Sequence, residues 1–370
     1  MAGGFSLDVY KERIARAQAE MARQGLDYLM VGPGSDLFYL TGYEAHDSER
    51  MNLLVIPQSG PVSIVVPVLE APLFRGRESL ATVHQWEETK QPAEVVAAIV
   101  GNAAGKKVGI GDTLRAVFLI RLQNHVGGAA WQSGNDVMRQ LRMQKDAAEI
   151  ETLQRVATLT DEAFMEFIET AQITGLTETQ AMNKLAALMD RRGLAGSFGI
   201  CASGPNSASP HHHTGDRVIQ RGDVVIFDWG GTIDGYHSDI TRTVVIGEPS
   251  DEVRKVYDIV RRANQAALDA AKPGVACEEI DKAARGLITA EGYGQYFLHR
   301  TGHGLGLDVH EEPYMVGGNR LALEPGMVFS DEPGIYMAGK FGVRIEDIVY
   351  CTETGAKRFN EATRDLMIMD

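Results

Sequence analysis

The fold is decided by the stretch at residues 223–246, which reads DVVIFDWGGTIDGYHSDITRTVVI. Runs of β-branched residues lie on both sides of Asp234-Gly235, a dipeptide preferred in two-residue hairpin turns. The stretch therefore predicts an antiparallel hairpin, and a turn at this dipeptide sets Asp228 opposite Thr241.

Two carboxylates of this hairpin, Asp228 and Asp239, are predicted to share one face. In the register set by the turn they are diagonal neighbours, with backbones roughly 7–8 Å apart. Two acidic groups that converge on one face repel and raise each other's pKa unless a cation lies between them. The pair therefore indicates a metal site, although for two aspartates taken alone a strand-end cap and a turn residue are the commoner roles.

A glycine-rich segment downstream, TGHGLGLDVHE at residues 301–311, contains two histidines, His303 and His310. Glycines let backbone approach a site closely, and imidazoles in such a setting are candidate metal ligands or acid/base groups. Taken alone, the pattern is more often explained by a hydrogen-bonded structural histidine.

Two glutamates follow, Glu332 in FSDEPGIY and Glu346 in GVRIEDIV. Both interrupt apolar, strand-like runs, where an unpaired carboxylate is costly to bury. The alternative interpretation is a turn position before Pro333 for Glu332 and an ion pair with Arg344 for Glu346.

As a set, these residues have a simple charge balance. The four carboxylates would be balanced by two divalent cations, and His303 would add a neutral ligand. One nitrogen and otherwise oxygen donors, without a thiolate, favour Mn²⁺ or Co²⁺ and permit Zn²⁺. Two such ions about 3.5–4 Å apart can hold a bridging hydroxide and polarise a carbonyl, a common route to amide hydrolysis.

The chain is expected to divide near residues 143–145. Before this point, helical and strand-like patterns mix, which indicates a small mixed α/β domain with helices at 7–24 and 92–100 and strands at 28–31, 53–57, 62–66 and 108–110. After it, a long amphipathic helix from Asp146 and three further helices are grouped with hairpins rather than alternating with strands. We therefore expect an α+β fold with domains at residues 1–143 and 144–370.

The order of the motifs FDWG…YHSDITRT, TGHGLGLDVHE, DEPGIY and GVRIED resembles the creatinase, prolidase and methionine aminopeptidase superfamily. The resemblance covers residues 145–370, and the preceding region looks like the smaller domain of prolidase and aminopeptidase P. It implies a pita-bread catalytic fold behind a creatinase/prolidase-type N-terminal domain. It also implies a homodimeric metallopeptidase that hydrolyses the Xaa-Pro bond at the N-terminus of dipeptides or short peptides.

The resemblance implies a role for each matching residue. The ligands of the two metals would be Asp228, Asp239, His303, Glu332 and Glu346. Glu332 would also shuttle the proton of the bridging water, and His310 would hydrogen-bond the substrate carbonyl or the tetrahedral intermediate. His211, in the loop at residues 202–216, would bind substrate, whereas its neighbours His212 and His213 are expected to be solvent-exposed.

Two positions depart from the family pattern. Strict dipeptidases tend to carry an arginine four residues after the second histidine to hold the substrate carboxylate, but here that place is Tyr314. Arg344 is expected to be occupied by Glu346, so we expect peptides that extend beyond the proline to be cleaved at least as well as dipeptides. Asp331, directly before Glu332, is an additional acid without an assigned role.

Composition excludes several other classes of protein. With 50 acidic and 36 basic residues the net charge is −14, which disfavours nucleic acids and anionic lipid. No window approaches the ~18 apolar residues of a membrane span, and the start, MAGGFSLDVYKER, does not resemble a signal peptide. Cys201, Cys277 and Cys351 form no disulfide or zinc-binding pattern, so we expect a cytoplasmic protein.

Two alternative functions stay open: another enzyme of the same fold, methionine aminopeptidase-like or creatinase-like, and a catalytically inactive binding protein. Creatinase-like and binding members lack some or all ligands, whereas all five are present here. The leading domain of ~140 residues argues against a methionine aminopeptidase, which is normally the catalytic domain alone.

Overall fold

The computed structural model describes residues 5–370, so the first four residues of the stretch MAGGFSLDVYKER lie outside the described part. The chain separates into two compact units, Met1–Arg142 and Met143–Asp370. Within residues 5–370, no helix combines the length and the apolar character needed to cross a membrane.

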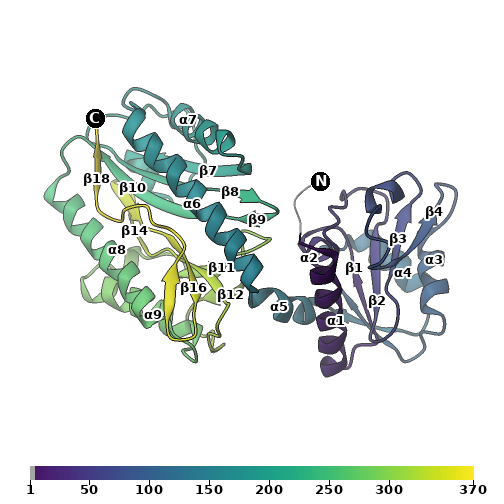
Figure 1. Ribbon diagram of the computed structural model, residues 1–370. Helices are drawn as coiled ribbons and strands as arrows, with labels where there is room; N and C mark the ends of the chain where they lie inside the picture. Colours follow the sequence, from purple (N-terminus) through teal and green to yellow (C-terminus); the bar gives the residue numbers. More distant parts are fainter. Residues whose placement is uncertain (1–4) are drawn as a thin grey trace. The chain divides into compact units, whose positions relative to one another are not determined.

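The N-terminal unit is built on a six-stranded mixed sheet with the strand order β4-β3-β2-β1-β5-β6 (Figure 1). Its strands are β1 (Tyr28–Val31), β2 (Leu53–Pro57), β3 (Ser63–Pro67), β4 (Thr82–Trp86), β5 (Lys107–Ile110) and β6 (Ala130–Ser133). Its helices are α1 (Leu7–Gln24), α2 (Ser35–Thr41), the 3₁₀ turn η1 (Ala71–Phe74), α3 (Pro92–Val100), α4 (Ala116–His125) and α5 (Asn135–Met143). The predicted helices α1 and α3 and the predicted antiparallel pair β2–β3 are confirmed.

The C-terminal unit contains, among the described residues, sheets with the orders β18-β10-β8-β7, with β9 beside β8, then β12-β11-β13-β16-β17, and β14-β15. The strands of the first are β7 (Ala195–Ser203), β8 (Val224–Ile233), β9 (Tyr236–His237), β10 (Ile240–Ile246) and β18 (Met367–Met369). Those of the second are β11 (Gly302–Gly304), β12 (Glu311–Met315), β13 (Val328–Asp331), β16 (Asp347–Cys351) and β17 (Ala356–Arg358). The small third sheet pairs β14 (Gly334–Met337) with β15 (Phe341–Arg344).

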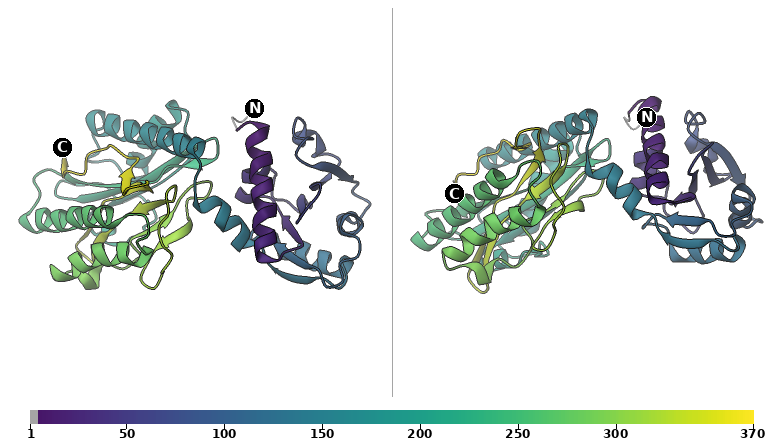
Figure 2. Two further views of the ribbon diagram at one scale, coloured as in Figure 1. Left: turned by 60° about the horizontal axis from the view of Figure 1, so that its bottom comes forward. Right: turned by 90° about the horizontal axis from the view of Figure 1, so that it is seen from below.

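Two pairs of helices cover these sheets, α6 (Ala147–Thr170) with α7 (Glu178–Arg191) and α8 (Asp251–Ala270) with α9 (Cys277–Ala290). Short 3₁₀ turns, η2 (Gly204–Ala208) and η3 (Gly294–Tyr296), lie in the connections. The apolar faces of α6 and α7 pack on β7, β8 and β10, while α8 and α9 share a second core with β13 and β16. Figure 2 shows the strands of this unit between the two helix pairs. This grouping of helices and sheets confirms the predicted α+β class.

The predicted hairpin is confirmed in its register. Asp228 pairs with Thr241, and the turn dipeptide has φ values of 52° at Asp234 and 84° at Gly235. Both values lie in the left-handed region that this type of turn requires, which Asp and Gly tolerate. Asp239 lies between β9 and β10, where the returning strand is interrupted.

The three cysteines are free and buried in the C-terminal unit. Cys201 belongs to the core beneath α6 and α7, and Cys277 and Cys351 belong to the core beneath α8 and α9. Burial raises the pKa of Cys277 to about 12 and that of Cys351 to about 11. All three thiols are therefore poor nucleophiles in the folded chain.

Candidate metal centre and active site

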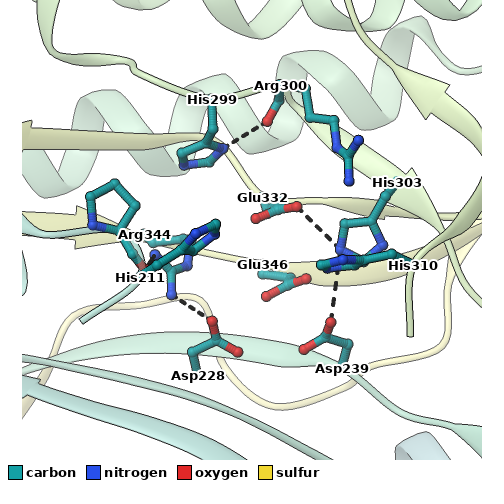
Figure 3. A pocket seen from close by; sticks show the side chains of 11 residues that line it. His211, Asp228, Asp239, His299, Arg300, His303, His310, Glu332, Arg344 and Glu346 are labelled. Carbon is teal, nitrogen blue, oxygen red and sulfur yellow. Dashed lines mark hydrogen bonds and ion pairs between the residues drawn. The ribbon is translucent and has the colours of Figure 1, made fainter. Parts of the chain in front are cut away.

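Strands from both large sheets bring the predicted residues together. Asp228 lies in β8, Asp239 after β9, His303 in β11, Glu332 directly after β13, and Glu346 between β15 and β16. Because both large sheets of the C-terminal unit contribute, residues more than 100 positions apart in the sequence share one site. Figure 3 shows their side chains pointing toward a common space.

That space is a cavity of about 330 Å³. The walls include every residue for which the sequence predicts a role in the site, His211 and His310 among them. They also include four residues without such a prediction, namely Pro210, His299, Arg300 and Arg344.

The candidate ligand atoms lie close enough to share cations. They fall into three overlapping groups, within each of which the donor atoms are no more than 4.8 Å apart. The groups are Asp239 with His303 and His310, His303 with Glu332 and Glu346, and Asp228 with Asp239 and Glu346. The shared members link the groups into one cluster.

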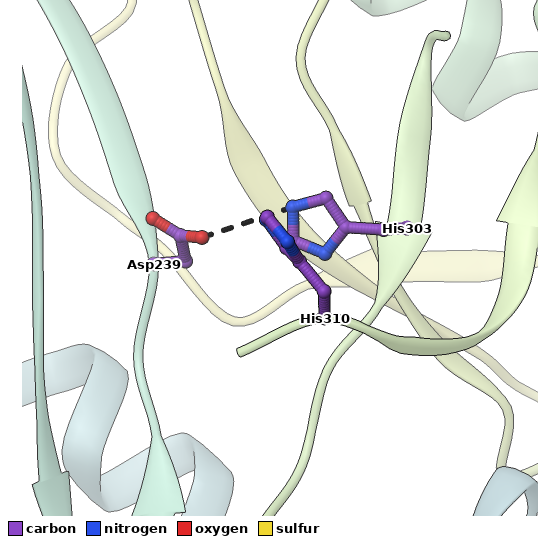
Figure 4. A group of neighbouring side chains, drawn as sticks. All are labelled: Asp239, His303 and His310. Atoms are coloured by element: carbon purple, nitrogen blue, oxygen red, sulfur yellow. Dashed lines mark ion pairs between the residues drawn. The ribbon is translucent and has the colours of Figure 1, made fainter. Parts of the chain in front are cut away.

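The tautomer of His303 follows from its hydrogen bond to the backbone. Its Nδ1 lies 3.0 Å from the carbonyl oxygen of Gly304, which can only accept, so Nδ1 carries the proton. The lone pair of Nε2 then faces Glu332 Oε1 at 3.3 Å and Asp239 Oδ2 at 3.8 Å. Burial, and then the nearby His310, lower the pKa of His303 to about 3, so the ring stays neutral as a metal ligand must be. Figure 4 shows this ring beside Asp239 and His310.

The buried carboxylates have oxygens without partners. Among the described residues, nothing donates to Asp239 Oδ1 or Glu346 Oε1, although both atoms are buried. Burial is the largest cause that raises the pKa of Asp239 and Glu346 well above the ordinary range, and it raises that of Glu332 to about 7. Cations among these oxygens would supply the missing partners and would remove the repulsion between the carboxylates. The residues present therefore fit a centre of hard divalent metals.

Neighbouring groups hold the other carboxylate oxygens in place. Thr241 Oγ1 donates to Glu346 Oε2 at 2.6 Å, and Ser330 Oγ donates to Glu332 Oε1 at 3.2 Å. Arg344 Nη2 donates to Asp228 Oδ2 at 2.6 Å. Such bonds fix the orientation of a ligand before metal binds.

The alternative prediction of an ion pair between Arg344 and Glu346 is wrong. Arg344 is buried, and its ion pair is with Asp228 across the cavity. Its remaining donors are held by neighbours, with Nη1 2.9 Å from Tyr336 Oη and Nε 3.0 Å from Thr241 Oγ1. The guanidinium is therefore fully engaged, though not by the residue that the sequence suggested.

The loop that carries His211 is held in place by the adjacent residue, His212. His212 was expected to be solvent-exposed, but it is half-buried and its Nε2 donates to Glu178 Oε2 at 2.8 Å. The carboxylate of Glu178, in the first turn of α7, is fully buried and therefore needs partners. It also accepts hydrogen bonds from the backbone and side chain of Ser203, the side chain of Asn206 and the backbone of Gly215. His213 is exposed, as predicted.

Asp331 lies outside the cavity. It is opposite Asp347 in the β13–β16 pair, and its backbone carbonyl accepts from Asn264 Nδ2 at 2.9 Å. Asp331 is the last residue of β13 and does not line the cavity that Glu332 enters. Burial, and then the charge of Asp347, raise the pKa of Asp331 well above the ordinary range.

Two residues of the cavity, His299 and Arg300, are not among the site residues predicted from the sequence. His299 Nδ1 donates to the carbonyl of Arg300 at 2.7 Å, and its Nε2 lies 2.8 Å from Tyr336 Oη. The guanidinium of Arg300 stacks on Tyr314, with Cζ 4.2 Å from the ring centroid. Their position directly before the TGHG motif could have indicated a place in the cavity wall, because residues next to a motif that lines a cavity often line it as well.

Comparison with protein families gives two matches along the chain. The model of the Creatinase/Prolidase N-terminal domain matches residues 13–144, and that of Metallopeptidase family M24 matches residues 151–353. The first match covers most of the N-terminal unit and the second most of the C-terminal unit.

Named relatives match over nearly the whole chain. A probable dipeptidase PepE of Mycobacterium tuberculosis is 40% identical over 99% of this chain and 98% of its own length. An Xaa-Pro dipeptidase of Pyrococcus horikoshii is 33% identical over 98% of this chain and 100% of its own.

Solved structures agree with this relationship. The crystal structure of dipeptidase PepE from Mycobacterium ulcerans superimposes with a TM-score of 0.93 at 41% identity, covering 99% of each chain. That of recombinant prolidase from Thermococcus sibiricus gives 0.92 at 39% identity, covering 99% of this chain and 100% of the other. The chain therefore belongs to metallopeptidase family M24, with the two-domain pita-bread architecture of the prolidases.

Proposed function

We propose that the protein is an Xaa-Pro dipeptidase that depends on two divalent metal ions per chain. The observation that carries the proposal is the convergence of four carboxylates and the neutral His303 on one cavity, with buried oxygens of Asp239 and Glu346 left without partners. Relatives named Xaa-Pro dipeptidase, at 33–37% identity over 90% or more of the chain, support the choice of bond.

The metal ligands in this proposal are Asp228, Asp239, His303, Glu332 and Glu346. Their donor set of oxygens with one imidazole favours Mn²⁺ or Co²⁺ and permits Zn²⁺. When bound, the metals supply Lewis acidity that lowers the pKa of water and polarises the scissile carbonyl.

The chain's own groups would move the proton and hold the substrate. Glu332 is proposed to take the proton of the attacking water and pass it to the leaving proline nitrogen, as a general base and then a general acid. His310 lines the cavity beside His303, with ring centroids 4.1 Å apart, and would donate to the carbonyl oxygen as negative charge develops there. His211, in the loop at residues 202–216, lines the same cavity and would bind the peptide.

Three broader features complete the proposal. Residues 144–370 would form the catalytic domain, behind an N-terminal domain at residues 1–143. A cytoplasmic location is supported by three buried, unpaired cysteines, and a homodimer by the family resemblance alone. Light scattering of the purified protein would test the dimer.

A peptide panel tests the function directly. Metal-free protein, reconstituted with Mn²⁺, Co²⁺ or Zn²⁺, is assayed on Ala-Pro, Ala-Leu, Met-Ala and Ala-Pro-Ala. We expect metal-dependent release of alanine from Ala-Pro and little from Ala-Leu. Preferred cleavage of Met-Ala would instead favour a methionine aminopeptidase-like enzyme, and activity that persisted without metal would refute the metal-dependent mechanism.

A further inference from the structure

The cavity contains a guanidinium for which the described residues supply no acidic partner, that of Arg300. Of the two arginines in the cavity wall, Arg344 is paired with Asp228 at 2.6 Å. No ion pair or side-chain hydrogen bond of Arg300 is found within residues 5–370; its contact is the stack on Tyr314. Figure 3 shows the guanidinium on the His303 side of the cavity.

The ring of Tyr314 lies beneath this cation and forms no hydrogen bond with it. Cζ of Arg300 lies 4.2 Å from the centroid of the Tyr314 ring, which is a cation–π distance, and within residues 5–370 none of its guanidinium N–H groups donates a hydrogen bond. Both partners are also fixed by backbone contacts. The carbonyl of Arg300 accepts from His299 at 2.7 Å, and that of Tyr314 accepts from Asn319 Nδ2 at 2.7 Å.

The charges of the site leave Arg300 free for an anion. Two divalent metals would balance the four carboxylate ligands, and Arg344 is already bound to Asp228. The carboxylate of a dipeptide belongs to the residue directly after the scissile bond, one Cα step of about 3.8 Å along the substrate. It must therefore lie in the same cavity as Glu332 and His310, whose wall Arg300 shares.

We infer that Arg300, stacked on Tyr314, binds the C-terminal carboxylate of the substrate through two parallel hydrogen bonds and makes the enzyme selective for dipeptides. This inference rests on the proposed peptidase function and deepens it. It replaces the expectation that longer peptides are cleaved at least as well, which rests on Tyr314 and Arg344 alone. In this chain, Tyr314 occupies the position of the family's arginine. The guanidinium comes instead from Arg300, in the segment before β11, and Tyr314 supports it.

The experiment compares a free carboxylate with its neutral amide. We would measure kcat/KM for Ala-Pro and Ala-Pro-amide, and for Ala-Leu and its amide, with the wild type, Arg300→Met and Arg300→Lys. The wild type should prefer the free acid by at least ~10-fold, and Arg300→Met should lower this ratio at least ~10-fold, mainly through KM. Arg300→Lys should retain part of the ratio, because a point charge lacks the bidentate geometry.

Matched variants separate the stack from the charge. Tyr314→Phe retains the ring face and should keep the preference for the free acid, whereas Tyr314→Leu should weaken it. Arg320→Met removes the same charge from a side chain that is 89% exposed and should change neither substrate series. Calorimetry of L-proline and prolinamide gives a readout without turnover, in which Arg300→Met should selectively weaken proline.

The inference is overturned if the acid-to-amide ratio and proline binding are the same in wild type and Arg300→Met. An equal loss on acids and amides would also overturn it, because that result indicates a structural or general catalytic role. Cleavage of Ala-Leu but not Ala-Pro would refute the Xaa-Pro proposal, while the Ala-Leu pair would still decide the role of Arg300.

Discussion

At the scale of single residues, the site is a set of polar groups that the fold buries together. Glu332 illustrates the consequence, because in the metal-free chain burial raises its pKa to about 7. The protonation of each group depends on its surroundings, and this dependence can be tested one residue at a time.

Glu332→Gln should abolish most turnover. The amide keeps the size of the side chain but removes its charge and its ability to take a proton, so we expect kcat to fall at least ~10²-fold with the fold retained. Glu252→Gln, the same change at a half-exposed surface residue, is the control for kcat and circular dichroism. Near-normal turnover of Glu332→Gln would exclude it as both proton shuttle and required ligand.

His299 should make folding stability depend on pH. Burial lowers its pKa to about 4, below the ordinary value of about 6.5, so the unfolded chain binds a proton more readily than the folded chain. The stabilising effect of the neutral ring is therefore present above about pH 6.5 and is lost as pH falls toward 4, by up to about 3 kcal/mol. Urea unfolding of metal-free wild type and His299→Gln across this range should show the difference, and parallel pH profiles would contradict it.

At the scale of elements, the site depends on how strands and loops are fixed to the helices around them. The first turn of α7 places Glu178 beneath the loop of His211. Burial alone would raise the pKa of Glu178, but hydrogen bonds from Asn206, Ser203 and His212 outweigh it and keep the carboxylate ionised. The helix thus positions a loop that contributes to the cavity wall.

Weakening this attachment should impair substrate binding while leaving the metals bound. Glu178→Gln and His212→Ala should each lower kcat/KM by about 10-fold, chiefly through KM, because His211 loses its fixed position. His212→Gln, which keeps a donor, should recover part of the loss, and His213→Ala at the exposed neighbour is the control. A loss of bound metal in proportion to the loss of activity would mean that the loop supports the ligands instead.

The elements also show what the sequence could and could not predict. The register of the β8–β9 hairpin followed from the Asp234-Gly235 turn, and the five candidate ligands were found because each stands within its own short motif. The contacts of Glu178 with His212 and of Arg300 with Tyr314 join segments that no local pattern relates. The order of the N-terminal sheet, where β1 pairs with β5, depends in the same way on contacts distant in sequence.

At the scale of the whole molecule, the metals and the fold should stabilise each other. The donor atoms come from both large sheets of the C-terminal unit, so bound metals would link its two halves. Without them, buried carboxylates repel one another, and the free energy of unfolding decreases accordingly.

Metal stabilisation should increase with pH. The raised pKa of Glu332, about 7, means that metal-free folded protein holds its proton while the unfolded chain loses it, so stability falls as pH rises from about 4.5 to 7. Metals remove this penalty. The gain in melting temperature on adding Mn²⁺ should therefore be larger at pH 7 than at pH 5, with about two metals per chain by elemental analysis. A pH-independent gain, or essentially no bound metal in an active enzyme, would contradict the dinuclear proposal.

The buried thiols offer a way to observe the opening of each half of the C-terminal unit. A thiol reagent can modify Cys201 only when the packing beneath α6 and α7 is breached, and Cys277 or Cys351 only when that beneath α8 and α9 is breached. The labelling rate of each cysteine, measured by mass spectrometry, thus reports how often each of the two cores opens. If bound metal holds the halves together, it should slow both labelling rates equally, so that the three buried cysteines report how cooperatively the unit opens.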